Sequence, residues 1–214
     1  MRSNLHDIGC VAVAVLAALS FFGSAHAIEA GAAKVEITPR VGTPLNGYIE
    51  RHGRDSLDVH DPLWARCLYL DDGETAVFVV SADLCIINPA LRRRVLEIAG
   101  KRLGVLPQQV VLCATHTHSG HGGMMHLLAH RAVSGRFIPE VLEETATTFV
   151  EAMQGAYLKR QRAAVGFKTV HGADLVRNRY EEKGTVDGQL CVIRVDDADG
   201  IPIAIAANFA AHPS

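Results

Sequence analysis

The 214-residue sequence lacks three features that would each indicate a particular class of protein. It has no long run of lysine or arginine and a formal net charge of −2, so no nucleic-acid-binding surface is expected. No apolar run reaches the ~20 residues that cross a bilayer, and the cysteines do not have the spacing of a structural zinc site. Hydrophobic residues make up 49% of the chain and charged residues 21%, which excludes an intrinsically disordered protein.

The first 27 residues have the pattern of a secretory signal peptide. A short charged start precedes an apolar run of about fifteen residues, and Ser24-Ala25-His26-Ala27 closes it with small residues. We expect cleavage after Ala27, a secreted or periplasmic protein, and no transmembrane segment in the mature chain. Export permits disulfides, but a domain of this size does not need them. Each of the four remaining cysteines lies alone in an apolar run, so we expect buried free thiols at Cys67, Cys85, Cys113 and Cys191.

Hydrophobic periodicity in residues 28–214 predicts one α/β domain, a mixed β-sheet flanked by helices. Helices are expected to begin at Pro89, ending at the Gly104 cap, and at Pro139. Arg92-Arg93-Arg94 falls outside the apolar stripe of the first helix and is expected on its solvated face. Strands are expected over residues 33–37, 63–71, 75–81, 109–114, 164–170, 190–196 and 202–208.

Two connections in this pattern bear on function. Asp72-Gly73 predicts a hairpin, and the helix between strands 75–81 and 109–114 predicts a parallel crossover between two buried strands. The long irregular stretch from residue 42 to 62 is of a length that is usually functional in compact domains.

The last strand is apolar enough to need cover on both faces, and the chain stops soon after it. We therefore expect the chain to be the front part of a longer protein.

The clearest chemical motif is Thr115-His116-Thr117-His118-Ser119-Gly120, where a predicted strand gives way to a glycine-rich loop. Residues two apart on a strand face the same side, so His116 and His118 can reach one point. Imidazole pairs at the carboxyl ends of strands favour a metal site, most often zinc. His212 also follows an apolar strand and is a candidate further ligand.

Several segments together resemble the N-terminal catalytic domain of the neutral/alkaline, non-lysosomal ceramidases. In chain order they are Val35-Glu36-Ile37-Thr38-Pro39, Gly42-Thr43-Pro44-Leu45-Asn46-Gly47-Tyr48, His60-Asp61-Pro62-Leu63-Trp64-Ala65-Arg66, Ser81-Ala82-Asp83-Leu84, Ala114-Thr115-His116-Thr117-His118-Ser119-Gly120, Arg177-Asn178-Arg179 and His212. The resemblance implies a zinc-dependent amidase that cleaves ceramide, or a related N-acyl lipid, into sphingosine and a fatty acid. A peripheral contact with a membrane is compatible with such a substrate.

The resemblance also implies roles for individual residues. His116 and His212 would bind Zn²⁺, while His118 would stabilise the charge that develops on the amide oxygen. Arg179 would contribute to the substrate site, with Arg177 as the neighbouring alternative. Asp83 could support a metal-bound histidine or cap a turn.

Two departures from the family pattern leave alternatives open. His121 replaces a proline that usually follows Ser-Gly, and it could alter the loop or reach the metal. The family takes a glutamate and a tyrosine ligand from beyond the second histidine, and this chain ends two residues after His212. We leave open whether this chain alone is an enzyme. The alternatives are a non-catalytic, exported metal- or lipid-binding fragment, and a metallo-β-lactamase-like hydrolase, which His116, His118 and His121 fit except that Gly120 replaces an aspartate.

Overall fold

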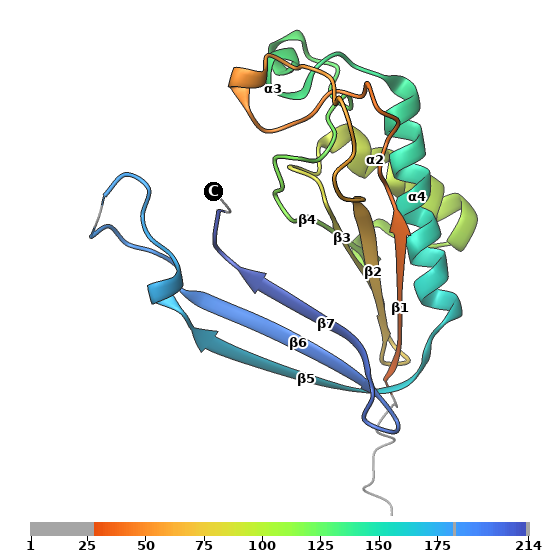
Figure 1. Cartoon of the computed structure of the whole chain (residues 1–214). Helices are drawn as coiled ribbons and strands as arrows, with labels where there is room; N and C mark the ends of the chain where they lie inside the picture. Colours follow the sequence, from red (N-terminus) through yellow and green to blue (C-terminus); the bar gives the residue numbers. More distant parts are fainter. Residues whose placement is uncertain (1–27, 182, 213–214) are drawn as a thin grey trace, which may run out of the picture.

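The computed structural model describes residues 28–181 and 183–212, which form one seven-stranded sheet with helices on one face (Figure 1). The signal peptide expected over residues 1–27 lies outside this range. The strands are β1 (Glu29–Glu36), β2 (Trp64–Asp71), β3 (Ala76–Ala82), β4 (Val110–Ala114), β5 (Gln161–His171), β6 (Gln189–Asp197) and β7 (Pro202–Phe209). The helices are α2 (Pro89–Leu103), α3 (Arg131–Ser134) and α4 (Pro139–Leu158), with 3₁₀ turns at Ile49–Arg51, Pro107–Gln109, Leu128–His130 and Ala173–Leu175.

The strands follow the order β4-β3-β2-β1-β5-β6-β7. β3 and β4 are parallel and α2 lies between them in the chain, whereas the other neighbouring strands are antiparallel. Gly73, with a φ of 87°, makes the turn of the β2–β3 hairpin, a backbone conformation that glycine adopts without strain. The predicted mixed sheet, hairpin and parallel crossover are confirmed.

The helices form because their ends are capped and one side is apolar. In α2 the Asn88 side chain accepts a hydrogen bond from the Leu91 amide at 3.0 Å, and Gly104 ends the helix in the left-handed region. Arg92 and Arg93 are exposed, as predicted, whereas Arg94 is half-buried and pairs with Glu97 and Glu143. α4 covers β1, β2 and β3 and packs on α2, so its Phe149 is fully buried in the main core.

The sheet changes direction between its two halves. β5 pairs with β1 only at Glu29↔Arg162 and Ala30↔Gln161, and β5–β7 then diverge from β1–β4 (Figure 1). A second, small core joins the halves where Val195 packs with Ala30 and Leu68. Beyond it, a cavity of about 480 Å³ is lined by residues of β1, β2, β3 and β7.

Two predictions about burial are wrong for the described residues, because none of their helices covers the second face of the sheet. β4 alternates between half-buried and exposed residues after Val110 instead of being buried throughout. The last strand lacks cover, as expected: Ile205 on β7 is 63% exposed, and the described residues do not cover it. All four cysteines are free as predicted, but only Cys67 is buried, Cys113 is exposed, and the other two are intermediate.

Among the described residues, no helix has the length and apolar character needed to cross a membrane.

Candidate metal centre

The candidate site forms where the parallel strands β3 and β4 end side by side. Ala82 and Ala114 are paired at these ends, and the Thr115 amide donates to the Ala82 carbonyl at 2.9 Å. Cys85 follows β3, while His116 and His118 follow β4. His116 has a φ of 63°, which is uncommon for a residue with a side chain and marks a backbone held by its surroundings.

Three imidazoles meet at this position. The ring centroids of His116 and His118 are 4.9 Å apart, and the ring of His212, beyond the end of β7, is 5.0 Å from each. The three ring planes are nearly perpendicular to one another, at 80–89°. Residues separated by almost one hundred positions in the chain therefore form a single cluster.

The hydrogen bond made by His116 decides which of its nitrogens faces the cluster. Its Nδ1 lies 2.7 Å from the Cys85 carbonyl oxygen, which can only accept, so Nδ1 carries the proton and Nε2 presents a lone pair. A backbone carbonyl that holds a histidine in this way is typical of metal sites. Asp83 does not have this role, because its carboxylate binds Arg66 and accepts from the Trp64 amide.

The nitrogens of the cluster lie close together. The Nε2 atoms of His116 and His118 are 3.4 Å apart, so a metal held at Nε2 of His116 would lie beside the His118 ring. Ligand atoms of Cys85, His116 and His118 all lie within 4.8 Å of one another. Imidazole and thiolate are the donors that zinc prefers, so the residues present fit this metal.

The 3₁₀ turn at Ile49–Arg51 supports His118 from outside the cluster. The Tyr48 ring meets His118 edge-on at 4.6 Å between centroids. The Arg51 guanidinium donates to the His118 carbonyl oxygen and lies 4.7 Å over the Tyr48 ring. Gly47 is packed so closely that a Cβ there would lie 2.6 Å from Cγ of His118.

Burial and charge lower the pKa of His118 below its usual value. Desolvation is the largest cause, followed by the positive charges of His116, His212, Arg51 and Arg179. Arg179 thus acts electrostatically on the cluster from the segment between β5 and β6, whereas Arg177 is not among these charges. Burial raises the pKa of the Cys85 thiol.

His121 is not part of the cluster. Its ring is 1% exposed, and its Nε2 lies 3.0 Å from the Thr145 hydroxyl oxygen in α4. The expectation that it could reach the metal is wrong, since it packs into the core instead. The metallo-β-lactamase-like reading is wrong for the same reason, because it needs His121 beside His116 and His118.

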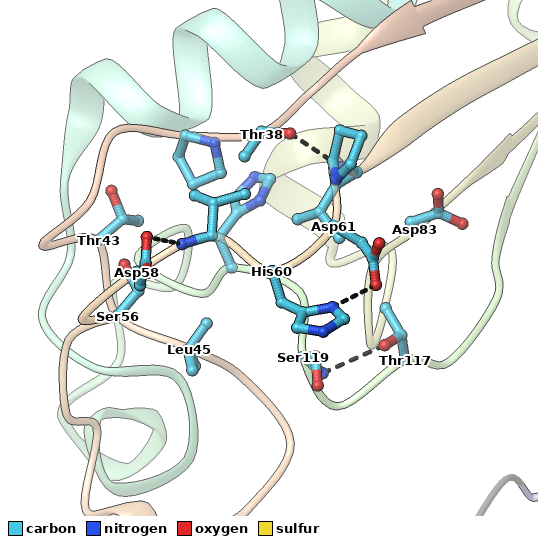
Figure 2. A pocket seen from close by; sticks show the side chains of 15 residues that line it. Thr38, Thr43, Leu45, Ser56, Asp58, His60, Asp61, Asp83, Thr117 and Ser119 are labelled. Carbon is cyan, nitrogen blue, oxygen red and sulfur yellow. Dashed lines mark hydrogen bonds and ion pairs between the residues drawn. The ribbon is translucent and has the colours of Figure 1, made fainter.

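A separate cavity of about 490 Å³ lies next to the site (Figure 2). Thr117 and Ser119, which alternate with the two histidines, line it together with residues of the 38–63 segment. His60 and Asp61 point toward each other there, with 2.7 Å between Nδ1 and the carboxylate, and both are largely exposed. None of the three clustered histidines lines this cavity.

The family model for the N-terminal part of the neutral/alkaline non-lysosomal ceramidases matches residues 28–214. The chain belongs to this family. It is 32% identical over 166 residues to the neutral ceramidase of Drosophila pseudoobscura pseudoobscura, covering 74% of this chain and 22% of that protein. It is 25% identical over 200 residues to the neutral ceramidase of Pseudomonas aeruginosa, covering 85% of this chain and 29% of that protein.

The fold of this ceramidase-family chain agrees with the family assignment. It superposes on the crystal structure of the Pseudomonas aeruginosa neutral ceramidase with a TM-score of 0.72 at 24% identity, over 86% of this chain and 31% of that one. The chain thus spans between about a fifth and a third of the length of the relatives named here.

Sequence reasoning selected the three clustered histidines but missed part of what surrounds them. Arg51, Gly47 and Cys85 were not predicted as site residues, and Tyr48 had no assigned role. Arg51 gave no pattern that could have identified it, whereas Gly47 and Tyr48 belong to a segment that carries the family resemblance. Cys85 could have been found, because it follows a strand predicted to lie parallel to the one that carries His116.

Proposed function

We propose that this chain is the N-terminal part, residues 28–214, of the catalytic domain of a zinc-dependent amidase that hydrolyses the N-acyl bond of ceramide to sphingosine and a fatty acid. Family membership supports ceramide as the substrate class. The observation that carries the chemistry is the convergence of His116, His118 and His212 from two distant strand ends.

In this proposal His116 and His212 hold Zn²⁺. The zinc would polarise the amide carbonyl and lower the pKa of a water molecule to ~7. His116 is prepared for this role because its proton is committed to the Cys85 carbonyl. His212 brings a second imidazole from the opposite edge strand of the sheet.

His118 and Arg179 act on the amide oxygen. As water adds to the carbonyl carbon, negative charge develops on this oxygen, and an imidazole N–H or a guanidinium stabilises it by a few kcal/mol. His118 is kept in place by the Arg51 hydrogen bond and the Tyr48 ring. The Arg179 guanidinium contributes positive charge at the same position.

The proposal includes export with removal of residues 1–27, and a substrate that reaches the site from a lipid surface. A non-catalytic metal-binding domain is the competing reading. Zinc binding and turnover must therefore be measured separately.

The test compares zinc content and ceramide hydrolysis in the wild-type chain and in H116A and H118A, with H171A, an exposed histidine on β5, as the control. We expect one zinc per wild-type or H171A chain and none in H116A. H118A should keep its zinc and lose about 10²–10³-fold in turnover. Zinc binding by H116A at the wild-type level would overturn the metal assignment, and zinc binding without hydrolysis in the wild type would show that residues 28–214 bind the metal but do not hydrolyse ceramide by themselves.

A further inference from the structure

A group of exposed apolar side chains lies next to the histidine cluster. Its members belong to the 3₁₀ turn at Ile49–Arg51 and to the segment just before α3, and they are 42%, 60%, 64% and 74% exposed in the order Tyr48, Ile49, Leu127 and Leu128. We call these four residues the apolar patch. The two segments lie side by side, because the turn packs against α3 at one end of the molecule (Figure 1).

The apolar patch is connected directly to the candidate site. The Tyr48 ring meets His118 edge-on, and Arg51 donates to the His118 carbonyl oxygen. Ile49 lies between Tyr48 and Arg51 in the chain, and its side chain faces solvent. A lipid held at the patch therefore lies beside the residue proposed to act on the amide oxygen.

The two segments that carry the patch are positively charged. Residues 48–54 contain two arginines and one acid, while residues 126–139 contain two arginines and no acid. Arg136 pairs with Asp55, whereas Arg131 is exposed and has no ion pair within the part of the chain that the structure describes. These segments thus present positive charge on a chain whose formal net charge is −2.

We propose that the apolar patch and the arginines around it bind the surface of an anionic lipid membrane. Apolar side chains on short turns can enter the headgroup region while basic side chains attract anionic lipids. The patch lines neither of the two cavities described above, and a bilayer receives such side chains without a shaped partner surface. The inference rests on the proposed function for its purpose, since it names the surface through which a lipid substrate is reached.

The first test measures cosedimentation of the chain with vesicles that contain phosphatidylcholine and phosphatidylserine but no ceramide. We expect the wild type to bind, and L127S/L128S to lose at least about tenfold in affinity, because two apolar side chains no longer leave water. The matched control is L106S/L158S. Its leucines are 54% and 69% exposed but lie in the loop after α2 and at the end of α4, so it should bind like the wild type.

The second test separates the contribution of charge. Wild-type binding should be weaker to vesicles of phosphatidylcholine alone, and added salt should weaken binding to the anionic vesicles. R131Q should lose about fivefold in affinity for the anionic vesicles. R93Q, which removes an exposed arginine of α2, should leave this affinity unchanged.

A third measurement does not depend on a loss of binding. The emission of L128W should shift to shorter wavelength when anionic vesicles are added, because the new ring moves from water into the lipid interface. L106W should show no such shift. The signal of Trp64 is common to both variants and is subtracted with the wild type.

The assignment is overturned if the wild type binds no vesicles, or if L127S/L128S binds them as tightly as the wild type. Loss of a wild-type dimer in L127S/L128S, with vesicle binding unchanged, would instead show that the patch contacts a second copy of the chain. H116A should bind vesicles like the wild type, because the patch does not need the metal. Vesicle binding by a wild-type chain that holds no zinc would leave the patch standing while the proposed function falls.

Discussion

The buried His121 should make the stability of this chain sensitive to acid. Its Nε2 lies 3.0 Å from the Thr145 hydroxyl oxygen, and the Thr145 hydroxyl donates its own proton to the Val141 carbonyl at 2.7 Å. Nε2 must therefore be the nitrogen that carries the imidazole proton, and Nδ1 has none. Nδ1 is buried without a hydrogen-bond partner. Burial lowers the pKa of His121 from 6.5 to about 4, because a charged imidazole would lose its hydration.

The sign and size of the effect follow from this difference. Between pH 6.5 and 4 the unfolded chain binds a proton at His121 that the folded chain does not, so stability falls as the pH falls through this window. At 1.36 kcal/mol per pKa unit, the loss between pH 7 and pH 4 is about 3 kcal/mol. Gln at position 121 can still donate to Thr145 and does not titrate, so H121Q should be spared this loss.

The assay is urea unfolding from pH 7 to pH 4, followed by the fluorescence of Trp64, the single tryptophan of the chain. Other titrating groups are common to both proteins and cancel when the two pH profiles are subtracted. The free energy of unfolding of the wild type should fall relative to H121Q by about 3 kcal/mol. Profiles that stay parallel within about 1 kcal/mol would show that His121 is not held neutral by burial.

Two further substitutions test the packing around the site and in the core. G47A should lower the free energy of unfolding by about 1–3 kcal/mol more than the control G42A does. Both glycines have a positive φ, but only a Cβ at position 47 would meet His118. Equal losses of stability in urea unfolding would contradict this contact. F149A removes a fully buried ring of α4 and should cost about 3–5 kcal/mol. A loss below about 1 kcal/mol in the same assay would mean that α4 does not anchor the core.

Local features of the sequence accounted for most of the secondary structure. The Pro89 helix could be predicted from its apolar stripe and from Gly104, which ends it in the left-handed region. The β2–β3 turn could be predicted because Asp72-Gly73 permits the backbone that the hairpin requires. Burial was predicted less well: Cys113 and Ile205 belong to apolar strands, but their exposure depends on which faces other segments cover.

The pairing of His116 with His118 was predicted from strand alternation. Both residues follow β4, which ends at Ala114, and His116 has a φ of 63°, so the loop after the strand brings the two rings together. Family resemblance, rather than spacing, linked His212 to them. In the structure β4 and β7 occupy opposite ends of the strand order, and their histidines meet because the sheet changes direction between its halves. Val195 packing on Ala30 and Leu68 stabilises that change of direction, and the contact joins residues far apart in the chain.

The amino-acid sequence by itself thus determined the elements and the chemical character of the site, because capping, turns and periodicity act between near neighbours. Only the tertiary structure decided which side chains share the site. It brought Cys85 beside His116 through parallel strand pairing, placed Arg51 on the His118 carbonyl, and directed His121 into the core. These contacts depend on how distant segments pack, and no local pattern specifies that packing.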